Sequence, residues 1–261
     1  MSISPPKRIS GRDNPEFKRF LAVHARKNRD LILVEGPKLL EEATRSSLPV
    51  QAIALSESRV GGIADPRIPH FHFSAALMKS LSEVETSQGV IALIARPRFT
   101  RDWLEERNAF VLILDGLQDP GNVGTLFRTA EAAGVSGSLL TRGCADPLSP
   151  KALRASAGSA FRLPHVPNLS ADALLALVPA RIKLVAAVSG PGALSVFDAP
   201  LSLPLALALG SEGSGLDPRI EAAAMHRVRV PSVRKVESLN VAAAGAVVMF
   251  EVARRAATLR A

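Results

Sequence analysis

The chain has 261 residues, of which 47% are hydrophobic, so it is long enough for one or two globular domains with cores of their own. Its formal net charge of +8 favours an acidic partner, most simply a nucleic acid, although surplus arginine can also serve only to keep a surface soluble. The single Cys144 excludes an intramolecular disulfide, and the lack of a signal peptide or of a run of about 18 apolar residues predicts a soluble, cytoplasmic protein.

The first 30 residues are strongly basic. Asn14 and Pro15 are typical of an N-cap and a first helical position. The expected packing face of this helix holds Phe17, Phe20, Leu21 and His24. The cations that are expected elsewhere around the helix, where they suit the phosphates of a nucleic acid, are Lys18, Arg19, Arg26 and Lys27. The pattern therefore predicts a helix that packs on one face and presents positive charge on the others.

A small α/β unit follows, ending near residue 95. Strand-like runs at 31–34, 50–55, 68–73 and 90–94 surround a helix-like stretch from Pro37 to Arg45. Proline and charge then replace the apolar pattern over residues 96–101, which is typical of a linker. We expect a first domain over residues 1–96, a linker over 97–108 and a second domain over 109–261.

The second domain alternates strands with helices. Strand-like runs occupy residues 111–114, 138–140, 183–188 and 205–209, and helix-like stretches occupy 123–133, 150–157, 171–177 and 239–255. This alternation predicts an α/β fold with a mostly parallel sheet covered on both faces.

Three short motifs follow strand-like runs in this domain. The first is Asn122-Val-Gly124-Thr-Leu-Phe-Arg128. Asn122 is a plausible N-cap, and Gly134 is expected to stop the helix. The planar fork of Arg128 suits a phosphate, although a helix-face ion pair is the alternative.

The second motif is the glycine-rich loop Gly210-Ser-Glu212-Gly-Ser-Gly215. It lacks the Lys-Ser/Thr ending of a Walker nucleotide site and the spacing of a dinucleotide fold. Glu212 suits hydrogen bonding to a hydroxyl or an amine, whereas an exposed Glu on a glycine-rich turn is the alternative.

The third motif is Val230-Pro231 followed by Ser238-Leu239-Asn240-Val241. Ser238 or Asn240 is placed to cap the last helix. That helix is apolar nearly all round, so we expect it to be buried in the domain or against a partner chain.

Together and in this order, the three motifs resemble the SpoU (TrmH) family of RNA ribose 2′-O-methyltransferases within the SPOUT superfamily. The resemblance spans about residues 110–255. The segments Ile9–Pro15 and Val34–Leu40 also resemble the substrate-binding domain of that family, a small ribosomal-protein-L30e-like α/β module.

The resemblance implies S-adenosylmethionine as cofactor, a trefoil knot in the C-terminal domain and a homodimer formed through that domain. It places Gly210, Val230 and Leu239 at the cofactor. The positions that it assigns to catalysis and RNA contact are Asn122, Arg128, Glu212, Ser238 and Asn240. The departures from the family pattern, which affect the shape of the cofactor pocket, are Ser232, Arg234, Lys235 and Ala242.

A ribosomal RNA is the expected substrate in preference to tRNA, by analogy with the appended domain. Two alternatives stay open: an inactive RNA-binding homologue, and a methyltransferase of the same fold acting on tRNA or on a base. His70 and His72 are expected on a strand surface rather than in a metal site, and no metal is expected. Cys144 is expected to be an inert thiol.

Overall fold

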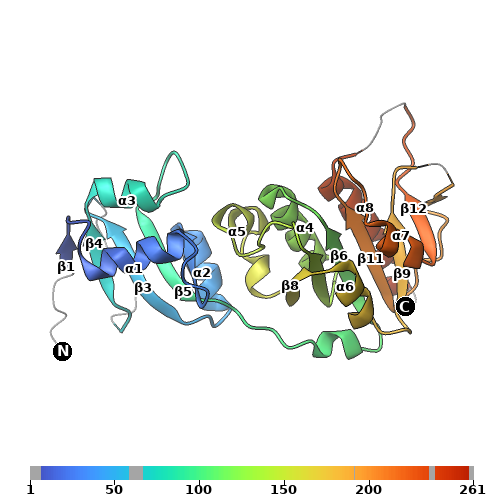
Figure 1. Ribbon diagram of the computed structural model, residues 1–261, viewed down its shortest axis with the longest axis horizontal. Helices are drawn as coiled ribbons and strands as arrows, with labels where there is room; N and C mark the ends of the chain where they lie inside the picture. Colours follow the sequence, from blue (N-terminus) through green and yellow to red (C-terminus); the bar gives the residue numbers. More distant parts are fainter. Residues whose placement is uncertain (1–6, 59–66, 191, 235–238, 259–261) are drawn as a thin grey trace.

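The computed structural model describes residues 7–58, 67–190, 192–234 and 239–258, and each half of the chain contains one β-sheet (Figure 1). The first half comprises β1 (Lys7–Ile9), α1 (Pro15–His24), β2 (Leu31–Glu35), α2 (Pro37–Arg45), β3 (Val50–Ser56), β4 (His70–Phe73), α3 (Ala75–Leu81) and β5 (Val90–Ala95). A 3-10 helix, η1 (Asp102–Glu105), precedes the second half.

The second half contains seven strands and five α-helices among the described residues. They are β6 (Phe110–Asp115), α4 (Pro120–Ala132), β7 (Gly137–Thr141), α5 (Pro150–Ser156), the 3-10 helix η2 (Ser159–Phe161), β8 (His165–Leu169), α6 (Ala171–Leu177), β9 (Lys183–Ala187), β10 (Leu194–Ser195), β11 (Leu205–Gly210), α7 (Pro218–Ala223), β12 (His226–Arg229) and α8 (Val241–Thr258).

The N-terminal sheet has the order β1-β4-β3-β5-β2 and mixes parallel and antiparallel pairs. The predicted cap of α1 is confirmed, because the side chain of Asn14 accepts a hydrogen bond from the Glu16 amide at 2.9 Å. Leu21, however, was wrongly expected on the packing face, since it is 41% exposed. Val23 is buried instead, as it continues the i, i+3 spacing of Phe17 and Phe20.

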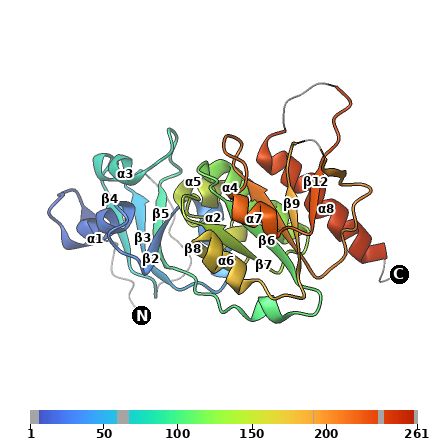
Figure 2. The same ribbon diagram turned by 45° about the vertical axis from the view of Figure 1, so that its right-hand side comes forward.

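The C-terminal sheet has the order β10-β12-β9-β11-β6-β7-β8, and every strand pair in it is parallel, as predicted. Alternate residues of β6 enter two separate cores: Leu112 and Leu114 face α4 and α8, whereas Val111 and Ile113 face α6 and α7. The predicted coverage of both faces is therefore confirmed (Figure 2). Several short elements were not predicted: β1, α3, β8, β10, α7 and β12.

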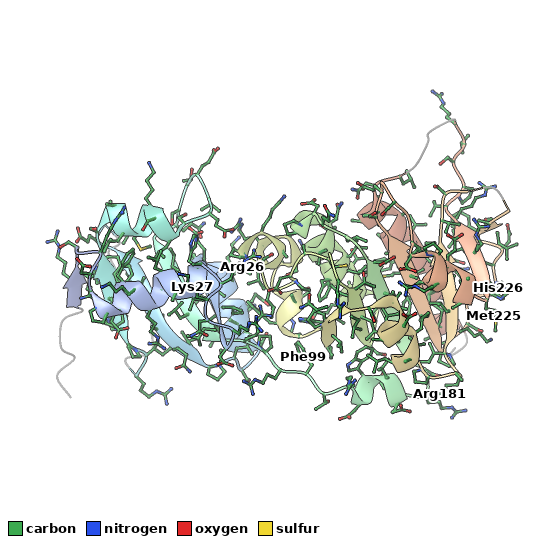
Figure 3. The ribbon with its side chains drawn as sticks, in the orientation of Figure 1. Arg26, Lys27, Phe99, Arg181, Met225 and His226 are labelled. Carbon is green, nitrogen blue, oxygen red and sulfur yellow. The ribbon has the colours of Figure 1, made fainter. Side chains whose placement is uncertain are left out.

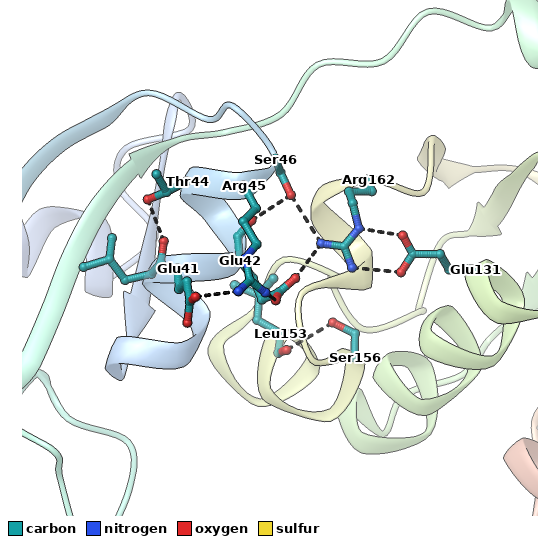
Figure 4. A network of polar contacts seen from close by, with 10 residues as sticks. Glu41, Glu42, Thr44, Arg45, Ser46, Glu131, Leu153, Ser156 and Arg162 are labelled. Carbon is teal, nitrogen blue, oxygen red and sulfur yellow. Dashed lines mark hydrogen bonds and ion pairs between the residues drawn. The ribbon is translucent and has the colours of Figure 1, made fainter.

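The two halves pack against each other. Apolar residues of β2, α2 and β5 belong to the same buried cluster as residues of α4 and β6. Arg162 also joins the halves, because its guanidinium donates to Glu131 at 2.6 and 2.9 Å and to Glu42 of α2 at 2.8 Å (Figure 4). The N-terminal half thus packs against the domain of the parallel sheet through both apolar and charged contacts.

The connection between the halves is structured at its C-terminal end. Trp103 and Leu104 of η1 are buried in the core that β6 shares with α6. Gly137 of β7 leaves the space that the Trp103 ring occupies, since a Cβ on this glycine would lie 2.4 Å from the indole. Among the helices of the described ranges, none is long and apolar enough to cross a membrane.

Candidate active site

The three sequence motifs meet at the C-terminal edge of the parallel sheet. Asn122 follows β6, Glu212 follows β11 and Asn240 follows β12. The side-chain nitrogen of Asn240 donates to Asn122 Oδ1 at 3.1 Å and to Glu212 Oε1 at 2.9 Å. All three residues keep solvent-accessible side chains, so this junction can contact a ligand.

Asn240 and Glu212 also build the start of α8. The side-chain oxygen of Asn240 accepts from the amides of Ala242 at 3.0 Å and Ala243 at 3.3 Å, which confirms it as a cap. Glu212 accepts from the Val241 amide at 3.1 Å, where a carboxylate also favours the positive end of the helix dipole. The helix begins at Val241, two residues later than expected. Ser238 and Lys235 lie outside the described residues.

The start of α4 differs from the prediction that Asn122 caps it. The cap is Asp119, whose carboxylate accepts from the amides of Gly121 at 3.1 Å and Asn122 at 3.3 Å. Pro120 fits the first helical position, which places the cap one residue before it. The side chain of Asn122 is consequently free to accept from Asn240. The hydrogen bond from Lys151 at 2.8 Å, together with the Gly121 amide, lowers the pKa of Asp119.

Gly124 of the first motif has a packing role. A Cβ on this residue would lie 2.3 Å from the carbonyl oxygen of Ala152 and 2.6 Å from the side chain of Ala155. Only a glycine therefore allows α5 to cross α4 so closely.

The glycine-rich loop closes on itself. The amide and carbonyl of Ser211 pair with those of Gly215, at 3.1 and 2.9 Å, and the hydroxyls of Ser211 and Ser214 lie 2.7 Å apart. Gly210 has no room for a side chain, because a Cβ would lie 2.3 Å from the Gly215 carbonyl. The loop is thus a compact turn that projects Glu212 towards α8.

Asp115 anchors this loop, and the sequence reasoning missed it. Its carboxylate is buried at the end of β6, where it accepts from the Thr141 hydroxyl at 2.6 Å and from the Asp217 amide at 2.5 Å. The signal was present, since a carboxylate ends an otherwise apolar strand. Asp115 therefore ties β6, β7 and the far end of the glycine-rich loop together.

A cavity of about 750 Å³ opens beside the junction. Gly210, Val230 and Leu239, which were predicted to bind the cofactor, all line it, as do Ser232 and Arg234. Its volume lies within the range of about 300–1,000 Å³ that is typical of cofactor sites. It offers the apolar walls and the backbone groups of the glycine-rich loop that an adenosyl ligand requires.

The remaining predicted residues that the structure describes form no hydrogen bond with Asn122, Glu212 or Asn240. Arg128 is exposed on α4 and forms no hydrogen bond or ion pair with any described residue. Lys18 pairs with Asp13 at 3.3 Å, and Arg19 lies 3.8 Å from Glu16. Arg26 and Lys27 are exposed just beyond the end of α1.

Cys144 is a free, partly buried cysteine, and His70 and His72 lie on β4. Burial raises the pKa of the Cys144 thiol, which donates to the Leu114 carbonyl at 3.2 Å. Within the described part of the chain, no group of three or more histidine, cysteine or acidic residues is placed to hold a metal ion.

Comparison with known proteins identifies relatives over the whole length. Residues 109–250 match the SpoU rRNA methylase family, and residues 7–92 match the MRM3-like substrate-binding domain. The chain is similar to the 23S rRNA guanosine 2′-O-methyltransferase RlmP of Bacillus subtilis, with 32% identity over 94% of this chain and 98% of that protein. It is also similar to a tRNA/rRNA methyltransferase of Synechocystis, with 32% identity over 95% of this chain and 93% of that one.

Solved structures show the same similarity. The SpoU methyltransferase AviRb of Streptomyces viridochromogenes in complex with the cofactor AdoMet is similar with a TM-score of 0.82 and 26% identity, over 94% of this chain and 99% of that one. An RNA 2′-O ribose methyltransferase is similar with a TM-score of 0.77 and 30% identity, over 96% and 99% of the two chains.

Proposed function

Because the chain belongs to the SpoU rRNA methylase family, we propose that the junction of its three loops is the place where a ribose 2′-hydroxyl of RNA is methylated. The protein is an RNA 2′-O-methyltransferase that depends on S-adenosylmethionine. The observation that carries the proposed location is the convergence of Asn122, Glu212 and Asn240 beside the cavity.

Gly210, Val230 and Leu239 hold the cofactor in this proposal. S-adenosylmethionine, when bound, supplies an activated methyl group on a sulfonium centre. Val230 and Leu239 offer apolar surface, and the closed turn after Gly210 offers backbone donors and acceptors. Ser232 and Arg234, where this chain departs from the family pattern, line the same cavity, so the departures alter one wall of the site rather than its position.

The chain's own residues must align the 2′-hydroxyl, exclude water and assist departure of its proton. We assign Arg128 to holding the adjacent phosphate and stabilising negative charge that develops on the oxygen, because a guanidinium stays protonated in proteins and is a poor base. Asn122 and Glu212 shape the site, and Asn240 lies near the reacting hydroxyl. Ser238, which precedes Asn240 by two residues, completes the proposed set.

The substrate in this proposal is ribosomal RNA, as the relative of Bacillus subtilis methylates 23S rRNA by name. Residues 1–96 form the substrate-binding domain, residues 97–108 the linker and residues 109–261 the methyltransferase domain. Lys18, Arg19, Arg26 and Lys27 contribute phosphate contacts, whose strength falls with salt. The net charge of +8 supports this assignment.

We further propose a trefoil knot in the C-terminal domain, an L30e-like fold for the N-terminal domain, and a homodimer. The path of α8 supports the knot, because this helix follows β12 near one edge of the sheet and yet packs against α4 and the central strand β11. Large apolar side chains that stay exposed support a dimer through the C-terminal domain: Phe250 of α8 is 51% exposed and Phe197 is 55% exposed.

The test of this proposal compares an RNA substrate with its all-DNA copy, using S-adenosylmethionine labelled on the methyl group. Transfer to the RNA and none to the DNA is expected, since the DNA lacks the 2′-hydroxyl. Equal transfer to both would exclude ribose methylation. Binding of the cofactor without transfer to any RNA would favour an inactive RNA-binding homologue.

A further inference from the structure

We propose that a cavity between the two halves of the chain binds the phosphodiester backbone of the RNA substrate, at a distance from the nucleotide that is methylated. This inference rests on the proposed function and names the surface over which the RNA enters. The cavity, here called the interdomain cavity, has a volume of about 480 Å³. Its lining includes Arg26, Arg29 and Arg96 from the first half and Thr141, Asp146 and Asn168 from the second.

Two arginines that line this cavity have no acidic partner among the described residues. The side chains of Arg26 and Arg29 are exposed and form no hydrogen bond or ion pair with any described residue (Figure 3 labels Arg26). Arg96 bonds to Asp146 at 2.5 Å, which ties the two walls together and neutralises that carboxylate. Glu83 is the remaining carboxylate of the lining. The cavity therefore presents two available guanidinium groups against one carboxylate.

Arg26 occupies a backbone position that suits glycine better. Its φ is +56°, in the left-handed region, and it directly follows the C-cap of α1. The amide of Lys27 donates to the Ala22 carbonyl at 2.9 Å, and the amide of Arg26 donates to the Val23 carbonyl at 2.9 Å. Helices that end with this pair of hydrogen bonds usually have glycine at the left-handed position. The feature that arginine adds here is a cation directed at the cavity.

Asn168 lies on the opposite wall and also has a positive φ, of +62°. It is exposed, and its side-chain amide is not hydrogen-bonded to any described residue. An amide donor thus lines the same cavity as the two guanidinium groups. Arginine binds phosphate bidentately and an asparagine amide adds a neutral donor, so a phosphodiester matches this set better than a metal or a sugar does.

The interdomain cavity is connected to the junction of the three motifs through one continuous edge of the sheet. Thr141, in its lining, bonds to Asp115, and the Ala145 amide donates to the Leu117 carbonyl at 2.8 Å. The segment after Leu117 leads directly into Asp119 and Asn122. A strand of RNA held in the cavity can therefore continue along this edge to the reacting junction.

The cations in and just after α1 fall into two groups. Lys18 pairs with Asp13 just before the helix, Arg19 lies 3.8 Å from Glu16 on the helix, and neither lines the cavity, whereas Arg26 does. The proposal therefore assigns the stronger RNA contact to the end of α1 rather than to its outer face.

The experiment uses the full-length protein and an unmodified ribosomal RNA transcript to which the parent protein transfers methyl groups. Arg26→Gly and Arg29→Ala are combined in one variant. The expected result is a rise of at least tenfold in KM for the RNA, and a fall of about 1 to 2 in the slope of log affinity against log salt. The Kd for S-adenosylmethionine should not change, and the Tm should equal or exceed that of the parent, because glycine suits the left-handed position.

Arg107→Ala is the matched control, since Arg107 is an exposed arginine before β6, at the opposite edge of the sheet. Its KM for RNA should equal that of the parent. The single variant Arg26→Lys keeps both the positive charge and a side chain at the left-handed position. Its RNA affinity should therefore equal that of the parent.

An unchanged KM and salt slope in the double variant would overturn the proposal. An equal rise in KM for RNA in Arg107→Ala would overturn it as well. So would a loss of RNA affinity in the double variant, if the Tm also falls and Arg26→Lys shows the same loss. Failure of the parent protein to methylate any RNA would instead contradict the proposed function itself.

Discussion

The side-chain nitrogen of Asn240 donates a hydrogen bond to Glu212 Oε1 at 2.9 Å, although 28 residues separate the two in the sequence. This bond joins the start of α8 to the glycine-rich loop. Because Leu239 and Gly210 line the same cavity, the bond links two of its walls. The geometry of the cavity therefore depends on polar contacts at its rim as well as on its apolar lining.

Asn240→Ala removes the cap of α8 and the bonds to Asn122 and Glu212. Loss of a cap costs about 0.5–2 kcal/mol of unfolding free energy, and the affinity for S-adenosylmethionine should fall as the rim loosens. Thermal unfolding and calorimetric titration of the cofactor measure the two effects. Asn240→Asp is the control, because it keeps the cap acceptor but places a second carboxylate beside Glu212. An alanine variant as stable as the parent would show that the cap is dispensable.

Arg128→Ala should abolish turnover and leave both the Tm and the Kd for S-adenosylmethionine near those of the parent. The reason is that Arg128 is exposed and bonds to no described residue, so its removal disturbs no contact within the described chain. Single-turnover methyl transfer measures the effect, and Arg128→Lys tests whether charge alone suffices. A rate above one tenth of the parent rate, by the order-of-magnitude standard for a group that stabilises transition-state charge, would remove Arg128 from the reaction.

Gly210→Ala should lower both the Tm and the cofactor affinity, since the added Cβ would lie 2.3 Å from the backbone of Gly215. Gly213 is the matched control in the same loop, because a Cβ there meets nothing within 4 Å. Differential scanning fluorimetry with and without cofactor compares the two variants. Equal behaviour of Gly210→Ala and Gly213→Ala would contradict the described packing of the loop.

Asp115→Ala leaves the partly buried amide of Asp217 and the buried hydroxyl of Thr141 without their acceptor. An unsatisfied buried donor costs about 1–3 kcal/mol, so chemical denaturation should show a clear loss of stability. Asp115→Asn keeps one acceptor oxygen for the Asp217 amide and should fall between the alanine variant and the parent. The same order is expected for cofactor affinity, and a reversed order would mean that Asp115 does not position the loop.

His165 makes the stability of the protein depend on pH. Burial between Phe99 and Phe127 lowers the pKa of its imidazole below the ordinary value of 6.5. As the pH falls below about 6.5, the unfolded chain binds a proton that the folded chain does not, so the unfolding free energy decreases. His165→Phe keeps an aromatic ring but cannot titrate. Between pH 7 and pH 5 the Tm of the parent should therefore fall by more than the Tm of the variant. A difference in Tm that does not change with pH would contradict the assignment.

Much of the architecture was predictable because strong local patterns decide it. Continuous apolar runs define β6 and β11, and Asn14-Pro15 marks the start of α1. Helix starts were less certain where two capping residues compete. Asp119 and Asn122 lie three residues apart, and Pro120 decides between them.

Contacts between distant segments were not predictable from local patterns. The motif residues Asn122, Glu212 and Asn240 were expected to share a site because their loops follow strand-like runs and resemble one family, whereas their mutual hydrogen bonds follow from the tertiary fold. Asp115 was missed because a polar residue at a strand end is usually part of a turn. The interdomain network of Arg162 was equally invisible, because Glu42 lies 120 residues away.

The most direct test of the account is transfer of labelled methyl groups from S-adenosylmethionine to unmodified ribosomal RNA, followed by mass spectrometry of the nucleosides. The account predicts a single 2′-O-methylated nucleoside, which the Arg128→Ala variant does not produce. A methyl group on a base, or no incorporation into any RNA by a protein that binds the cofactor, would contradict it.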